Sequence, residues 1–113
     1  AKKLVKQNGF KTRVEPTTNR REALDGADYV IVAIEVGGPR PMRIIRDIAT
    51  KHGIDKTVNM DTMGSGGVFY GSRQVPVILD ICHDMEELCS DAWLLNYTNP
   101  MAMISWAINE NRD

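Results

Sequence analysis

The chain has 113 residues, 42% hydrophobic and 26% charged, so it can fold around one core instead of remaining disordered. Its net charge of −1 excludes the strongly positive surface of a nucleic-acid binder, and its longest apolar run, six residues, excludes a membrane span. With two cysteines and no apolar signal segment at its first residues, we expect a cytoplasmic protein with no nucleic-acid or membrane partner.

The first part of the chain predicts short elements. Residues 1–10 predict the end of a helix, and residues 11–18 predict a strand of modest quality because Pro16 lies inside it. Thr18 or Asn19 can then cap a brief helix that follows directly.

The middle part predicts one strand and one helix. Residues 29–34, YVIVAI, are continuously apolar and mostly β-branched, which is typical of a strand buried on both faces of a parallel sheet. Residues 42–52 alternate apolar and charged groups at helical spacing, with isoleucines 44, 45 and 48 on one face.

The second half predicts a Gly-rich loop, a long helix over much of 67–89, a buried strand over 92–97 and a final helix after it. Pro76 should kink the long helix or mark its effective start. Because two buried strands with helices between them require crossover connections, we predict a doubly wound, parallel α/β fold.

Two glycine-containing segments lie where open α/β sheets bind ligands, beyond the carboxyl ends of strands. Gly37-Gly38 would let a ligand approach the backbone closely, or would simply form a tight turn. The segment GSGG at 64–67 could hold an anion or a sugar hydroxyl with its N–H groups, or serve as a flexible helix entry. It matches neither a Walker loop nor a GxGxxG turn.

Three polar residues complete the candidate site. Asp61 is a lone acid that either is solvated or polarises a proton-transferring partner. The amides of Asn96 and Asn99 suit sugar or ribose hydroxyls, although an Asx turn ending the strand is the alternative. We predict that Asn99 leaves the carboxyl edge of the sheet facing a cavity shared with the Asp61 loop.

Other conspicuous residues have structural explanations. Adjacent residues on a helix point about 100° apart, so the Cys82-His83-Asp84 run does not predict a metal site. Both cysteines suit core packing, and the two tryptophans suit core or edge positions.

Three segments together resemble the NAD-dependent glycoside hydrolases of family 4, in particular the α-galactosidase and α-glucosidase branch. They are TTNRREALDGADYVIVAIEVGG, KHGIDKTVNMDTMGSGGVFYGSRQVPVILDI and DAWLLNYTNPMAM. The resemblance implies that residues 1–113 are part of a Rossmann-like NAD-binding domain, containing its strands 3, 4 and 5. It also implies a homo-oligomer that hydrolyses small glycosides through NAD-dependent oxidation at C3, elimination and addition of water.

The resemblance assigns roles to five residues. Asn99 matches the asparagine that contacts the sugar, and Asp61 matches an acid that raises the basicity of the catalytic tyrosine. Val36 and Gly37 match the turn beside NAD, with Asn96 near the nicotinamide. The family's Mn²⁺ ligands and base tyrosine lie beyond residue 113, so no metal ligand is expected within this chain.

Two departures from the family pattern matter. Met42 stands near the position where 6-phosphoglycosidases carry an arginine for the phosphate, so a non-phosphorylated sugar is expected. The Gly-rich turn and the first two strands of the family are absent. We therefore expect a piece of a larger enzyme, whose open strand edge pairs with another copy or rearranges.

Two other functions are also compatible with the sequence. A lactate or malate dehydrogenase domain also has an apolar strand that ends in an Asn-Pro turn, although the RREAL and GSGG segments argue against it. A catalytically inactive assembly module is the other alternative, since the expected metal ligands and base are missing.

Overall fold

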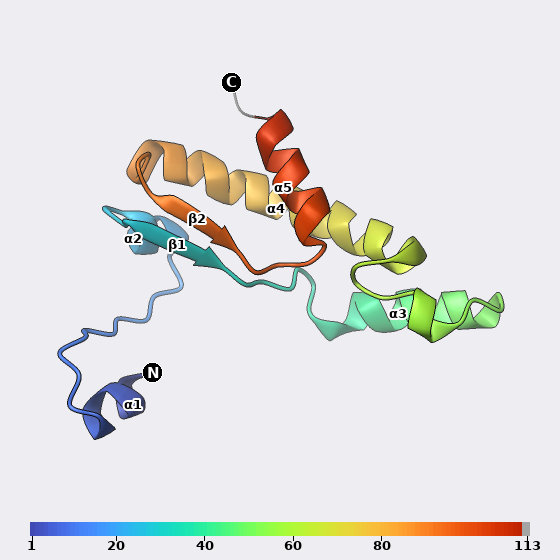
Figure 1. The fold of residues 1–113 in the computed structure, drawn as a ribbon, viewed down its shortest axis with the longest axis horizontal. Coiled ribbons are helices and arrows are strands. Elements are labelled where there is room, and N and C mark those ends of the chain that lie inside the picture. The colour runs from blue at the N-terminus through green and yellow to red at the C-terminus, as the bar shows by residue number, and fades with distance from the viewer. Residues whose placement is uncertain (112–113) are drawn as a thin grey trace.

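The computed structural model describes residues 1–111 as helices around a small sheet (Figure 1). In chain order the elements are α1 (Lys2–Gln7), α2 (Arg20–Leu24), β1 (Tyr29–Val32), α3 (Pro39–Lys51), the 3-10 helix η1 (Lys56–Val58), α4 (Gly64–Leu88), β2 (Trp93–Asn96) and α5 (Met101–Glu110).

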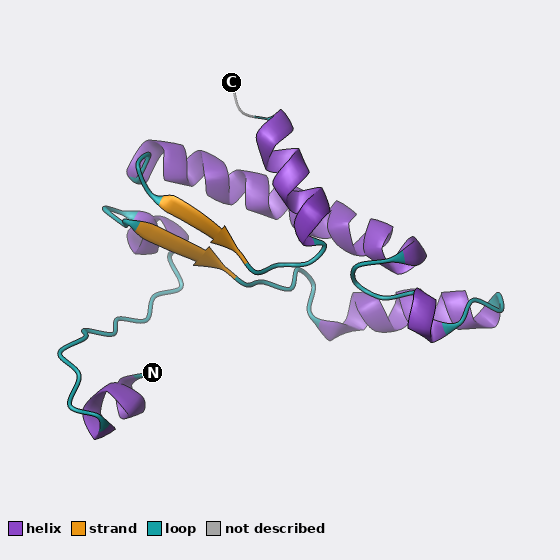
Figure 2. Ribbon diagram, viewed as in Figure 1, coloured by secondary structure: helices purple, strands orange, loops and turns teal. Residues whose placement is uncertain are grey.

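The two strands form a parallel pair, with Tyr29 opposite Trp93 and Val32 opposite Asn96. The connection between them passes through α3 and the long helix α4, which returns alongside the sheet (Figure 2). This arrangement confirms the predicted parallel α/β fold with a helical crossover, because parallel strands cannot be joined by a tight turn.

The core lies between α4, the sheet, α2 and α5. Its buried apolar residues come from all of these elements: Leu24, Val32, Ile78, Ile81, Met85, Cys89 and Ile104. Cys82 packs against this cluster, so both cysteines have the predicted packing role. On α4 the buried apolar residues Ile78, Ile81 and Met85 recur at helical spacing, as expected for a long helix with one face in the core.

The long helix begins earlier than predicted and continues through its proline. It starts at Gly64 instead of residue 67, and Pro76 neither begins nor ends it. Pro76 is exposed, so water can solvate the carbonyl that loses its helical N–H partner there.

The predicted strand over residues 11–18, expected as strand 3 of the family fold, is wrong. These residues have no strand structure and almost all are exposed, and Figure 1 shows the first part of the chain standing away from the sheet. A strand needs a neighbour for its backbone groups, and no other strand among residues 1–111 lies beside this segment.

The prediction that residues 29–34 are buried on both sheet faces is also wrong. Val32 is buried and Val30 packs on the core, but Tyr29 and Ile31 remain 68% and 66% exposed. Trp93 on β2 is 69% exposed and is therefore not a core residue. The packed helices cover one face of the sheet, and the other face is bare within the described residues.

Candidate functional site

Two predicted site residues meet at the carboxyl edge of the sheet. Asn99 follows β2, and Asp61 lies in the loop before α4. The Nδ2 atom of Asn99 donates a hydrogen bond of 2.8 Å to Oδ2 of Asp61. Because 38 residues separate them in the chain, this contact confirms that both side chains face the same region.

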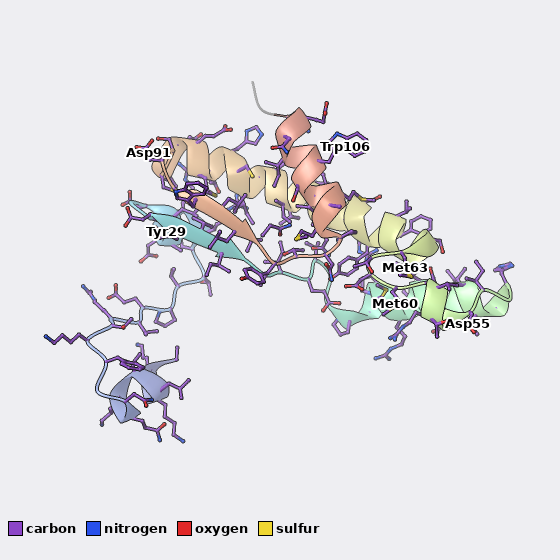
Figure 3. All side chains as sticks on the ribbon, viewed as in Figure 1. Tyr29, Asp55, Met60, Met63, Asp91 and Trp106 are labelled. Carbon is purple, nitrogen blue, oxygen red and sulfur yellow. The ribbon has the colours of Figure 1, made fainter. Side chains whose placement is uncertain are left out.

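Asp61 of this pair also lines a cavity of about 400 Å³. Its walls come from the loop after β1, from α3, from the loop before α4 and from α4: Glu35, Met42, Arg46, Asn59, Met60, Asp61 and Tyr70. Figure 3 shows Met60 and Met63 in the loop that lies between α3 and α4. The volume is in the range of small-ligand sites, and its lining has two carboxylates, one guanidinium and two neutral polar side chains that can form hydrogen bonds.

Tyr70 is the largest neutral polar group of this cavity. Its side chain is only 8% exposed, and the guanidinium carbon of Arg73 lies 5.5 Å from the ring centroid. Burial raises the pKa of the Tyr70 phenol, the carboxylates of Glu35 and Asp61 raise this pKa further, and Arg73 opposes them. The phenol is therefore uncharged at neutral pH and can donate a hydrogen bond.

The loop after β1 has the predicted tight turn. Gly37 and Gly38 have φ angles of 83° and 64°, and a Cβ on Gly37 would lie 3.0 Å from Cγ of Pro41. The N–H of Val36 donates to Oε1 of Gln74, 3.2 Å away, which ties the loop to α4. The turn accounts for the glycine pair, and the role of Val36 and Gly37 beside a cofactor stays a prediction.

Asn96 forms an Asx turn, which the sequence analysis gave as the alternative to a ligand-binding role. Its Oδ1 accepts the N–H of Thr98 at 2.9 Å, and its Nδ2 donates to the carbonyl of Thr98 at 3.2 Å. The buried hydroxyl of Thr98 in turn accepts the N–H of Ile34 at 3.0 Å. The Asn96 amide therefore joins the two strand ends through Thr98, and its contact with nicotinamide stays a prediction.

The glycines of the segment at 64–67 allow close packing of the preceding loop. A Cβ on Gly66 would lie 2.5 Å from the carbonyl oxygen of Met60. The buried Asn59 accepts the N–H of Gly66 at 2.5 Å and the hydroxyl of Ser65 at 2.9 Å. These groups are therefore occupied within the chain, which favours the helix-entry explanation over an anion site.

Sequence reasoning missed several polar residues that shape this edge: Asn59, Tyr70, Gln74 and Thr98. An asparagine six residues before Ser65 in a Gly-rich helix entry was an available signal for Asn59. Gln74 and Thr98 had no local signal, because their partners are 38 and 64 residues away.

The part of the chain that the structure describes has neither a metal-binding cluster nor a membrane-spanning helix. Within residues 1–111, no group of three or more histidine, cysteine, aspartate or glutamate side chains is placed to hold a metal ion. No helix in the same range combines the length and apolar character that crossing a membrane requires.

Parallel strands, helical crossovers and polar loops at the carboxyl edge define a Rossmann-like α/β unit. The family model "Family 4 glycosyl hydrolase" matches residues 1–113, and the chain belongs to this family.

Curated relatives agree with this assignment. The chain is 46% identical over 109 residues to an α-galactosidase of Rhizobium meliloti (strain 1021), a match that covers 96% of this chain and 22% of the relative. It is 38% identical over 106 residues to a 6-phospho-β-glucosidase of Escherichia coli (strain K12), covering 94% and 23%. The chain thus spans less than a quarter of these two proteins.

Solved structures agree as well. A 6-phospho-α-glucosidase from gut microorganisms in complex with NAD and Mn²⁺ superimposes with a TM-score of 0.86 at 27% identity, covering 96% of this chain and 24% of that one. A structure described as a complex with NAD and glucose-6-phosphate gives 0.88 at 29% identity, covering 98% and 26%. The similar parts are therefore about a quarter of larger NAD-binding enzymes.

Proposed function

We propose that the protein carrying this chain hydrolyses the O-glycosidic bonds of α-galactosides or α-glucosides, using NAD and Mn²⁺. Residues 1–113 would form part of its NAD-binding domain. The observation that supports this most is the hydrogen bond between Asp61 and Asn99 beside a sugar-sized cavity, in a chain of family 4. Family membership favours this function over a lactate or malate dehydrogenase.

NAD would supply a hydride acceptor for oxidation of the sugar, and the turn at Val36 and Gly37 would lie beside it. The positive φ of Gly37 leaves backbone without a side chain there, which fits a closely approaching ligand. Asn99 would hold the sugar near its reacting carbons. Asp61, whose Oδ2 accepts the Asn99 amide, would keep Oδ1 to orient a base tyrosine outside residues 1–113.

Mn²⁺ would be held by ligands outside this chain. Residues 1–111 offer no group of three or more suitable side chains, and the family resemblance puts the cysteine and histidine ligands beyond residue 113.

The proposed substrate carries no phosphate. Met42 lines the cavity, near the position where the family resemblance puts a phosphate-binding arginine. The cavity also has the carboxylates of Glu35 and Asp61 against the single guanidinium of Arg46. A phosphate dianion would be repelled by this net negative charge, whereas sugar hydroxyls can bond to all three groups.

We further propose a cytoplasmic homo-oligomer. A content of only two cysteines in 113 residues fits a reducing compartment, and the bare apolar sheet face fits burial against further protein.

Hydrolysis by the full-length protein tests the proposed site. We expect Asp61→Asn and Asn99→Ala each to lower kcat/KM for p-nitrophenyl α-galactoside or α-glucoside by roughly 100-fold, because both groups orient reacting atoms. The assay includes NAD and Mn²⁺. Asp91→Asn and Asn109→Ala are matched controls, since both residues are exposed and lie outside the site. Full activity in both site variants would contradict the proposal, and hydride transfer to 2-hydroxy acids would restore the dehydrogenase alternative.

A further inference from the structure

Tyr70 combines a buried ring with an unused hydroxyl. Its side chain is 8% exposed, yet the residue lines the cavity beside Asp61. Buried phenols usually make a hydrogen bond, and within residues 1–111 none is formed by this hydroxyl. The hydroxyl is not fully buried, so a molecule in the cavity can reach it.

Arg73 contacts the ring, and the segment of α4 that carries Tyr70 is anchored by its neighbouring residues. Arg73 packs over it at 5.5 Å, and Gln74, one helical turn along α4, binds the backbone of Val36. Gly71, the next residue, lies against Pro100 and Met103 at the crossing with α5. A hydroxyl fixed by such packing loses little conformational freedom when it binds a ligand.

The surrounding charges define which partner suits the hydroxyl. Glu35 and Asp61 are carboxylates, so they can accept hydrogen bonds but cannot donate them. A sugar hydroxyl can donate to one of these carboxylates while it accepts from a phenol. Tyr70 is the neutral donor that complements the two acceptors.

We infer that Tyr70 is a substrate-specificity residue, whose hydroxyl donates a hydrogen bond to a hydroxyl of the sugar bound beside Asp61 and Asn99. This inference rests on the proposed function and adds a contact to it. Tyr70 is distinct from the family's base tyrosine, which the resemblance puts beyond residue 113.

The test is the variant Tyr70→Phe in the full-length protein, which removes only the hydroxyl and keeps the ring against Arg73. We expect KM for the α-galactoside or α-glucoside to rise about 3- to 10-fold, because one neutral hydrogen bond to the substrate is lost. The value of kcat should stay within twofold of the wild type, and the Kd of NAD should be unchanged. Tyr29→Phe is the matched control, because Tyr29 is exposed on the sheet face and does not line this cavity. Its KM should equal that of the wild type.

A series of monodeoxy glycosides identifies the sugar hydroxyl. For one deoxy sugar, KM should be higher than for the parent glycoside in the wild type. In Tyr70→Phe the two KM values should be equal, because the variant already lacks the hydrogen bond that this sugar hydroxyl makes. Unchanged KM in Tyr70→Phe, or equal additional losses for every deoxy sugar, would overturn the inference. A wild type that hydrolyses none of these glycosides overturns the proposed function as well, whereas an active wild type with an unaffected variant overturns this inference alone.

Discussion

At the scale of single residues, Asp84 is the charged group most firmly tied to the fold. It lies on α4 and accepts hydrogen bonds from the guanidinium groups of Arg20 and Arg21 on α2, the former at 2.6 Å. Burial acts to raise the pKa of Asp84, but the two arginines outweigh it and hold this pKa below its ordinary value. These ion pairs also explain why Asp84 is unavailable as a metal ligand.

This shift predicts how stability depends on pH. Since the pKa of Asp84 is lower in the folded protein than in the unfolded chain, its contribution is present above the ordinary carboxyl value and is lost as pH falls through the folded value. We expect Asp84→Asn to unfold at a lower temperature at pH 7 and to lose less stability than the wild type on acidification below about pH 4. Thermal unfolding from pH 2 to 7 measures this, with the exposed Asp80→Asn as control. Parallel pH curves for wild type and Asp84→Asn would refute it.

Some site residues were predictable from the sequence because their signals are local. Asn99 stands before a proline at a strand end, and Asp61 is a lone acid in a Gly-rich loop. Gln74 and Tyr70 lie in the predicted long helix, and no local motif distinguishes them from its other residues. Their importance comes from Val36 and from the cavity, which are distant in the chain.

At the scale of elements, the contact between α4 and α5 depends on Gly71. A Cβ at this position would lie 2.2 Å from the sulfur of Met103 and 3.3 Å from Cγ of Pro100. The sulfur belongs to a flexible chain that can move, but the proline ring cannot move as easily. Gly71 therefore serves as a contact point between the two helices.

We expect Gly71→Ala to be destabilising overall. Overpacking costs about 1–3 kcal/mol, against about 1 kcal/mol gained from the better helix propensity of alanine. In a Met103→Ala background the same substitution should be neutral or stabilising, because the closest contact has been removed. Chemical unfolding of the four proteins in this double-mutant cycle gives the coupling energy. Additive effects would show that the helices do not touch at Gly71.

Helices and strands were predicted correctly where the sequence pattern of a single segment is enough to specify them. The apolar runs became β1 and β2, and Asn19 caps α2 as one of the two predicted caps, accepting the N–H of Glu22. It failed for residues 11–18, because a strand also requires a partner strand, and none is present beside them within the described residues.

At the scale of the whole molecule, the described chain is extended. Its radius of gyration is 17.3 Å, whereas a compact domain of this length has about 13 Å. Large apolar side chains lie exposed on one sheet face: Tyr29, Ile31, Trp93, Leu95 and Tyr97. Such a face requires covering by further protein.

We therefore expect isolated residues 1–113 to self-associate and to bind NAD no more tightly than millimolar. Exposed apolar surface favours association, and the Gly-rich turn that cradles the pyrophosphate in the family is absent from this sequence. Sedimentation at several concentrations and calorimetric titration with NAD measure these two properties. A compact monomer, or micromolar NAD binding, would contradict the expectation. The double variant Ile31→Ser/Trp93→Ser should associate less, because both side chains lie on the bare face.

The sequence alone determined the parallel α/β class, the main helices and strands, and the resemblance to family 4, because apolar periodicity, turn residues and motifs act over a few neighbouring positions. Tertiary structure alone decided that Asp61 bonds to Asn99, that Tyr70 lines the same cavity as Asp61, and that one sheet face is bare within residues 1–111. These features join residues far apart in the chain, so they depend on the path of the folded backbone and on which elements lie beside one another.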